Sequence, residues 1–296
     1  MHIEMIDDGF CRIALENPDL NAYIIADKSG LALINPGHTS HRDQFDEALA
    51  ELGYSRDDVQ RTLATSWRPQ VLLGVDNFAS ATHFAFAEEL FTPAVWGDWL
   101  DQEKQRVGEL SSALGLPEEP FGALVMPIQN GDIWTAGDFR FEIIHSPGPD
   151  AGHILLREVD QNWMFGGEIA FDGLPLVSDV ETYIQHLDRA LELEPLMVFP
   201  NHGDPEVRGK WALARTSRFL HNFLSNVTSA LVEEPTLKDW VTRDLGFEPP
   251  EDELKLEMLR VKPFFEELVR AGHLIKEGEG LEATFKSRMN QPRRTL

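Results

Sequence analysis

Alternating apolar and polar segments divide the first part of the chain into short strands and one helix. Residues 21–26 and 31–38 are apolar runs on either side of a turn that contains Gly30, which predicts a β-hairpin. Residues 40–52 are mostly polar with apolar positions at helical spacing, which predicts an amphipathic helix. Residues 60–65 predict a further strand that leads into a polar turn.

A second group of strands is predicted in the middle of the chain. Alternation over residues 139–144 predicts one strand, and residues 154–159 and 163–165 predict a hairpin. Segments with Gly, Pro, His and carboxylate side chains follow these strands, at 145–153 and at 166–168.

The last third of the chain is predicted to be mainly helical. Apolar residues at helical spacing predict a helix from about residue 210, and Thr236 is a candidate N-cap for a second helix. A longer helix is predicted over 252–271, with Gly272 as its stop signal. A short two-stranded hairpin is predicted at 274–285. The order helix, helix, hairpin resembles a small winged-helix domain.

Four segments together resemble the metallo-β-lactamase-like hydrolases. The family's first hairpin ends in Leu-Ile-Asp-x-Gly, where residues 33–37 here read Leu-Ile-Asn-Pro-Gly, and its H-x-H-x-D-H metal turn corresponds to residues 66–71. Residues 145–153 are similar to the family's His-Thr-Pro-Gly-His-x-x-Gly-His loop, and 198–203 to its Pro-x-His-Gly turn. The resemblance implies an α/β, four-layer αββα sandwich, for which we expect residues 1–207, with a small winged-helix-like C-terminal domain over 208–296.

The positions that hold metal in this family carry different side chains here. Ser66, Arg68, Gln70 and Val71 replace the ligands of the turn, Pro149 replaces the loop histidine, Glu168 replaces the bridging aspartate, and His202 is kept. A catalytic zinc ion needs three protein ligands and an open position for water. Arg68 is permanently charged, so it repels a metal cation and attracts an anion. These residues argue against an ordinary dinuclear zinc site.

We first expect a degenerate member of the family that needs no cofactor. It would bind a small anionic ligand or a protein partner in the vestigial pocket. The residues expected to line that pocket are Ser66, Arg68, Gln70, Asp150, Glu168 and His202.

Two alternatives stay open, so the sequence leaves undecided whether the protein is an enzyme. One is a hydrolase with a rebuilt site, either metal-free or with one weakly held zinc, iron or manganese ion on Glu168, His202 and a neighbour such as Asp150 or His153. The other is a structural interaction protein in which an Arg68–Glu168 ion pair fills the emptied cavity. An open polar cavity at Arg68 would favour ligand binding, and a closed one would favour the structural role.

The composition of the chain limits which classes of partner and which cellular compartment we expect. The 296 residues carry a net charge of −24, with 15 Lys and Arg against 14 Asp and Glu in residues 208–296 and 11 against 36 before them. Such an acidic main domain argues against nucleic acids and anionic membranes as partners, and leaves a homo-oligomer open. No signal peptide or membrane-spanning run is evident and Cys11 is the single cysteine. We therefore expect a cytoplasmic protein.

Overall fold

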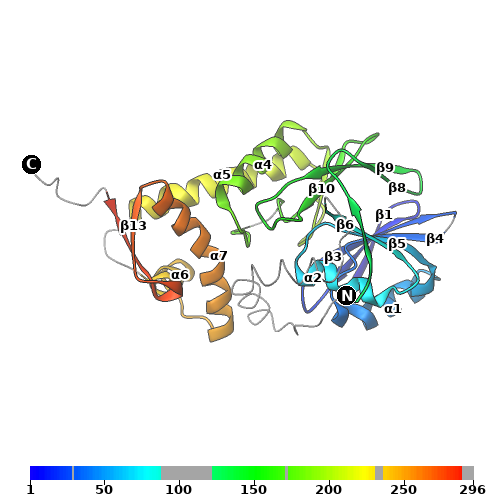
Figure 1. Ribbon diagram of the computed structural model, residues 1–296, viewed down its shortest axis with the longest axis horizontal. Coiled ribbons are helices and arrows are strands. Elements are labelled where there is room, and N and C mark those ends of the chain that lie inside the picture. Colours follow the sequence, from blue (N-terminus) through cyan, green and yellow to red (C-terminus); the bar gives the residue numbers. More distant parts are fainter. Residues whose placement is uncertain (29, 88–121, 171–172, 231–235, 289–296) are drawn as a thin grey trace, which may run out of the picture.

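Two β-sheets form the centre of the molecule in the computed structural model, which describes residues 1–28, 30–87, 122–170, 173–230 and 236–288 (Figure 1). The first sheet has seven strands in chain order, and β4 to β7 run parallel. Its strands are β1 (His2–Asp7), β2 (Phe10–Leu15), β3 (Leu20–Asp27), β4 (Gly30–Ile34), β5 (Val59–Ala64), β6 (Thr82–Phe86) and β7 (Val125–Ile128).

The second sheet has five strands in the order β12, β11, β10, β9 and β8. Strands β11 and β12 run parallel, and the other neighbours are antiparallel. The strands are β8 (Ile133–Ala136), β9 (Phe139–His145), β10 (Ile154–Glu158), β11 (Trp163–Gly167) and β12 (Met197–Pro200).

Alternating side chains pack the two sheets against each other and against helices. Phe165 and Phe199 point into the core between the sheets, where they meet Phe10 and Tyr23 of the first sheet. Their neighbours in sequence join the core on the outer face of the second sheet, as Met164 shows. This separation follows from the two-residue period of a β-strand.

Helices cover the outer faces, which completes four layers. The apolar side of α1 (Arg42–Glu51) packs on the first sheet with the short α2 (Pro69–Leu72). The second sheet is covered by α4 (Val180–Glu192) and α5 (Gly209–Ala230), which lie along one side of the molecule in Figure 1. The predicted αββα sandwich is therefore confirmed.

The C-terminal part continues from α5 into two helices and a small sheet. These are α6 (Leu237–Leu245), α7 (Glu251–Arg270), β13 (Leu274–Glu277) and β14 (Thr284–Ser287), with β13 and β14 antiparallel. Thr236 caps α6 as predicted, because its side chain accepts a hydrogen bond from Asp239 N. The winged-helix interpretation stays a prediction.

One hydrophobic cluster crosses the expected domain boundary at 207/208. It joins Leu155 and Met164 of the second sheet, through α4 and α5, to Phe264 and Phe285 of the C-terminal part. The boundary coincides with the beginning of α5, and the division into two domains stays a prediction. Over the described residues, no helix combines the length and the apolar character needed to cross a bilayer.

We predict that Phe265→Ala lowers the free energy of unfolding by about 3–5 kcal/mol. Phe265 is fully buried, and its ring lies 5.4 Å from that of Trp240 and 4.9 Å from that of Phe285. Urea denaturation followed by circular dichroism measures the change. Phe247→Ala is the control, since Phe247 is 57% exposed and its loss should cost about 0.5 kcal/mol or less. Equal costs for the two variants would contradict the packing described here.

Candidate functional site

The predicted site residues lie beyond the carboxyl ends of strands from both sheets. Strand β5 ends at Ala64, shortly before Ser66 and Arg68. In the second sheet, β11 leads directly into Glu168 and β12 leads through Asn201 into His202. The loop that follows β9 supplies Asp150 and His153. Because β4 and β5 run parallel, as do β11 and β12, these strand ends bring the residues together.

The Arg68 guanidinium is buried among four internal acceptors. Its Nη1 lies 3.0 Å from Glu168 Oε2, and its Nε lies 3.7 Å from Asp150 Oδ2. Its Nη2 donates to the carbonyl of Pro149 at 3.2 Å and to that of Leu176. The side chain is 6% exposed. Since a guanidinium stays charged in proteins, the two carboxylates neutralise it inside the protein.

Both oxygens of Glu168 are occupied. While Oε2 faces Arg68, Oε1 accepts a hydrogen bond from Asn201 Nδ2 at 3.2 Å and lies 3.3 Å from His202 Nε2. Burial by itself raises the pKa of Glu168, but the Arg68 guanidinium, His202 and Asn201 hold that pKa well below its ordinary value. Glu168 is therefore a buried, fully engaged carboxylate.

His202 connects this carboxylate to the surface. Its Nδ1 lies 3.1 Å from Asp19 Oδ2, and its side chain is 22% exposed. Burial lowers the pKa of His202, but Glu168 and Asp19 outweigh that effect and raise the pKa to about 9. At neutral pH the ring is an imidazolium that donates from both nitrogens, so it cannot act as a general base in that form.

Asp150 shapes the turn that carries Arg68. Its Oδ2 accepts a hydrogen bond from Ser66 Oγ at 2.6 Å, and its Oδ1 accepts from the backbone N–H groups of Trp67 at 3.1 Å and Gly152 at 3.0 Å. Ser66 Oγ in turn accepts from Arg68 N at 3.1 Å, and Ser66 has no exposed surface. The hydroxyl is thus a structural link and not an accessible nucleophile.

Three polar residues outside the predicted set extend the network. Asn35 Nδ2 donates to Asn201 Oδ1 at 2.8 Å, and Thr65 Oγ1 donates to Asn35 Oδ1 at 2.7 Å. Asn35 has a φ of +61°, a left-handed conformation that asparagine tolerates. From the sequence alone, Asn35 is only a departure from the family's aspartate. The change from aspartate to asparagine is the sequence feature that could have identified this residue. An amide both donates and accepts hydrogen bonds, whereas an ionised carboxylate only accepts them.

His153 lies at the border of the cluster and is engaged by the backbone. Its Nδ1 lies 2.8 Å from Ser146 O, and its Nε2 lies 3.0 Å from Glu168 N. Because Nδ1 faces a carbonyl and Nε2 accepts from an N–H group, we assign the neutral ring with its proton on Nδ1. Burial lowers the pKa of His153, which also favours the neutral ring. A Cβ on Gly167 would lie 2.3 Å from Nε2, so a glycine is required where the ring meets the strand. Neither nitrogen is directed at a vacant position.

Gln70 lies beside the cluster without joining its ion pairs. It is buried on α2, and its Oε1 has no hydrogen-bond partner within the part of the chain that the structure describes. Of the six residues expected to line one pocket, hydrogen bonds and ion pairs connect five: Ser66, Arg68, Asp150, Glu168 and His202.

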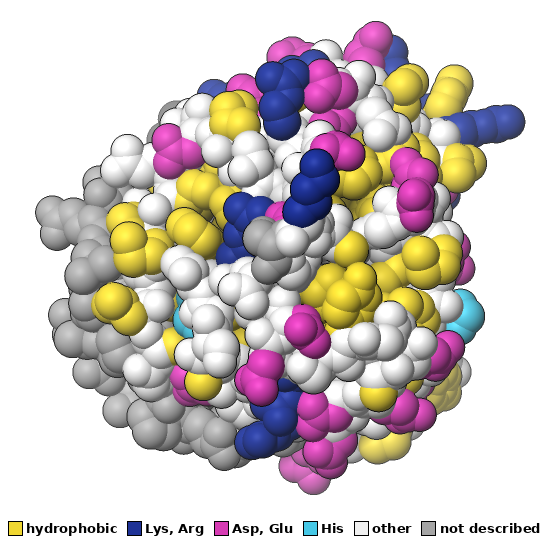
Figure 2. Space-filling model, turned by 90° about the vertical axis from the view of Figure 1, so that its right-hand side faces the viewer, with side chains coloured by type: hydrophobic (Ala, Val, Ile, Leu, Met, Phe, Trp, Pro, Cys, Tyr) yellow, Lys and Arg dark blue, Asp and Glu magenta, His cyan; other side chains and the backbone are white. Residues whose placement is uncertain are grey.

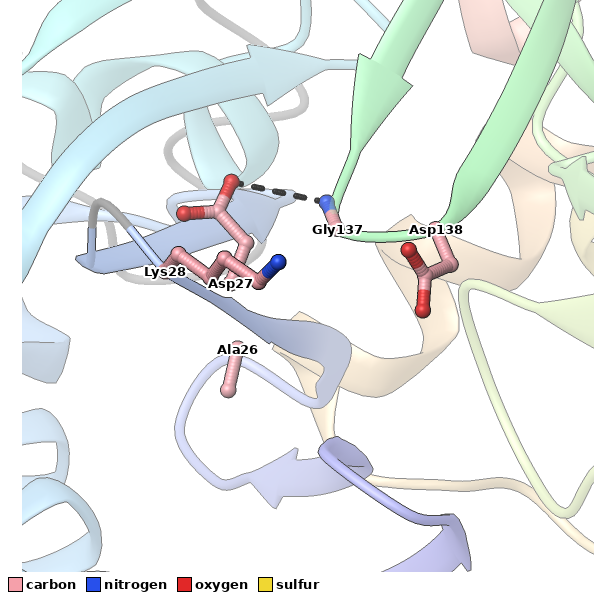
Figure 3. Close-up of a pocket in the computed structure, with 5 residues that line it drawn as sticks. All are labelled: Ala26, Asp27, Lys28, Gly137 and Asp138. Carbon is pink, nitrogen blue, oxygen red and sulfur yellow. Dashed lines mark hydrogen bonds between the residues drawn. The ribbon is translucent and has the colours of Figure 1, made fainter.

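A separate hollow of about 660 Å³ lies near the opposite end of β4. Figure 3 shows its lining, which consists of Ala26, Asp27, Lys28, Gly137 and Asp138. None of the predicted site residues lines it, and Asp27 is paired with Arg61 at 2.6 Å. This hollow therefore does not belong to the site.

The side chains do not suit the dinuclear zinc centre that the fold family implies. In the described residues, no group of three or more His, Cys, Asp or Glu side chains is placed to hold a metal ion. The guanidinium lies within ion-pair distance of the two carboxylates that would otherwise be available as ligands. A metal ion there would have to displace Arg68 or share its counter-charges.

Comparison with known sequences finds distant relatives. No protein-family model matches the chain. It is 22% identical over 189 residues to a β-lactamase-like protein 2 homolog of Drosophila melanogaster, a match covering 62% of this chain and 58% of that protein. It is 32% identical over 71 residues to an acyl-coenzyme A thioesterase of Homo sapiens, a match covering 22% of this chain and 25% of that protein. The chain thus spans less than two thirds of the length of either relative.

Solved structures resemble the chain over much more of its length. A metallo-β-lactamase family protein from Thermus thermophilus matches 96% of this chain and 100% of its own, with a TM-score of 0.75 and 17% identity. A β-lactamase domain protein from Burkholderia ambifaria matches 96% of this chain and 94% of its own, with a TM-score of 0.73 and 16% identity. A metallo-β-lactamase from Cronobacter sakazakii with a HARLDQ motif matches 76% of this chain and 98% of its own, with a TM-score of 0.57 and 15% identity. These likenesses establish the fold.

We predict that Arg68→Met lowers the free energy of unfolding by about 3–5 kcal/mol, because it leaves two buried carboxylates without their cation. Adding Glu168→Gln should restore part of the loss, since one of those charges is then removed. Urea denaturation of the single and double variants measures both effects.

The control for this cycle is Arg157→Met. Arg157 lies 3.6 Å from Glu142 in a pair whose side chains are 34% and 39% exposed, so its loss should cost about 1 kcal/mol or less. If Arg68→Met costs no more than this control, the Arg68 ion pairs do not stabilise the fold.

We also predict a pH-dependent contribution from His202. Because folding raises its pKa from about 6.5 to about 9, its stabilisation is complete below about pH 6.5 and is lost as the pH rises through about 9. The stability difference between wild type and His202→Gln should therefore shrink between about pH 6 and about pH 9.5. Urea denaturation at both pH values tests this, with the exposed His2→Gln as control. A difference that stays constant or grows with pH would contradict it.

Proposed function

This chain has the metallo-β-lactamase fold, and we propose that it is a structural interaction protein in which an ion pair fills the metal position, and not a dinuclear zinc enzyme. In this proposal Arg68 replaces the metal as the cation of the site. The supporting observation is the 3.0 Å contact between Arg68 Nη1 and Glu168 Oε2, with both side chains 6% exposed or less. The former active site then holds the sandwich together and catalyses no hydrolysis.

The same contacts argue against a small anion as the ligand of Arg68. Its nitrogens already face two carboxylates and the carbonyls of Pro149 and Leu176. An anion would have to break these bonds and would approach Asp150 and Glu168, whose charges repel it. The geometry thus favours the structural role of the cluster over the ligand pocket first expected from the sequence.

A rebuilt hydrolase is the second candidate, and two comparisons favour it. The matched thioesterase hydrolyses acyl-coenzyme A by its name, and the HARLDQ motif of the Cronobacter metallo-β-lactamase has arginine as its third residue, as residues 66–71 have here. His202 would be the group of the cluster that meets solvent. As an imidazolium it could donate a proton, but a hydrolase of this design would still need an activated water.

Zinc binding distinguishes the proposal from the metal-dependent form of the rebuilt hydrolase. After incubation with zinc and desalting, we predict well below one equivalent in the wild type by inductively coupled plasma mass spectrometry. Arg68→His should bind several-fold more, because it removes the guanidinium and adds an imidazole beside Glu168 and His202. Arg140→His is the control, since Arg140 is 54% exposed and lies outside the cluster.

Near-stoichiometric zinc in the wild type that is lost in His202→Ala combined with Glu168→Ala would contradict the proposal. It would favour the mononuclear hydrolase instead, and acyl-thioester hydrolysis would then be the first activity to assay.

A further inference from the structure

A pocket of about 220 Å³ lies between the start of α4 and the middle of α7. Its floor is apolar, since it is formed by the buried side chains of Val177, Val180 and Leu259. A water molecule occupies about 30 Å³ in the liquid, so the pocket has room for an organic molecule of about six to ten non-hydrogen atoms. No described residue that contacts Arg68 lines it, so the pocket is separate from the Arg68 cluster.

One cation of the pocket has no counter-ion. Lys262 lines the pocket, and within the residues that the structure describes its ammonium group makes no ion pair or hydrogen bond. The other described basic residue of the lining is Arg270, which pairs with Glu267 at 2.5 Å and with Glu181 at 2.6 Å. The Lys262 ammonium group, with its three N–H donors, is therefore available to the carboxylate of a ligand.

Three carboxylates of the pocket each use only one oxygen. Asp179 Oδ1 accepts from a backbone N–H group in the first turn of α4 at 2.8 Å. Glu266 Oε1 lies 3.0 Å from Lys276 Nζ, and Glu267 Oε2 accepts from Arg270 Nε at 2.9 Å. Over the described part of the chain, the second oxygen of each carboxylate has no hydrogen bond. These oxygens can accept from the ammonium group of a ligand.

We propose that this pocket binds a free α-amino acid with an apolar side chain, of about the size of leucine. The carboxylate of the ligand pairs with Lys262, and its ammonium group pairs with the second oxygens of Asp179, Glu266 and Glu267. Its side chain covers the apolar floor, as is typical of small-molecule sites in which a few polar groups fix the orientation of the ligand.

The charges of the molecule favour such a zwitterion over a simple anion or cation. The chain has a net charge of −24, and acidic side chains are scattered over the end of the molecule that Figure 2 shows. This field and the three carboxylates of the pocket repel a simple anion, whereas the unpaired Lys262 repels a simple cation. An amino acid has no net charge and offers each group of the pocket its complement.

The inference does not rest on the proposed function. The amino acid would contact residues of α4 and α7, and the ion pairs of Arg68 contribute none of its binding groups. Zinc binding at the Arg68 cluster would therefore contradict the proposed function without contradicting this inference, and the reverse also holds.

Isothermal titration calorimetry of the 296-residue chain with leucine, up to about 10 mM, tests the proposal. The wild type should bind one leucine molecule. Lys262→Met should weaken binding at least about tenfold, because it removes the cation and keeps a side chain of similar length. Lys255→Met is the control, since Lys255 lies on the same helix and is not among the described residues that line the pocket. Circular dichroism checks that both variants are folded.

Two leucine analogues test the two charges of the ligand separately. N-acetylleucine keeps the carboxylate but lacks the ammonium group, and leucinamide keeps the ammonium group but lacks the carboxylate. Each should bind at least about tenfold more weakly than leucine. The proposal would be overturned if leucine does not bind, if Lys262→Met binds it as tightly as Lys255→Met does, or if either analogue binds as tightly as leucine.

Discussion

A guanidinium enclosed by two buried carboxylates is the interaction on which the described site depends. Removing three charges from water is costly, and the cost is offset only when each charge has close partners of opposite sign and satisfied hydrogen bonds. Arg68, Asp150 and Glu168 meet both conditions. The same contacts connect the turn after β5, the loop after β9 and the end of β11. The ion pairs that neutralise the buried charges therefore also hold these three segments in place.

The strand ends could be predicted from sequence because they follow local patterns. Apolar alternation located β9, β10 and β11 to within two residues. Glu168 and His202 were identified by the resemblance of the segments that hold them to the family's motifs. The expected pairing of Arg68 with Glu168 also follows from a general rule, since a buried carboxylate needs a cation.

The rest of the network could not be predicted, because it depends on residues far apart in the chain. Asp19 meets His202 across 183 positions, and Asn35 meets Asn201 across 166. No local pattern encodes such pairs, which arise only when both sheets are assembled. The same limitation applies to the edge strands β1 and β8 and to the cluster that joins α7 to the second sheet.

The fold is that of the metallo-β-lactamase-like structures, and at its strand ends an internal cation neutralises two buried carboxylates. X-ray diffraction from crystals grown with zinc, recorded on both sides of the zinc absorption edge, tests this claim most directly. The account predicts density for the Arg68 guanidinium between Glu168 and Asp150, with no anomalous peak at that position. An anomalous peak bound by Glu168 and His202, with Arg68 turned away from both carboxylates, would contradict it.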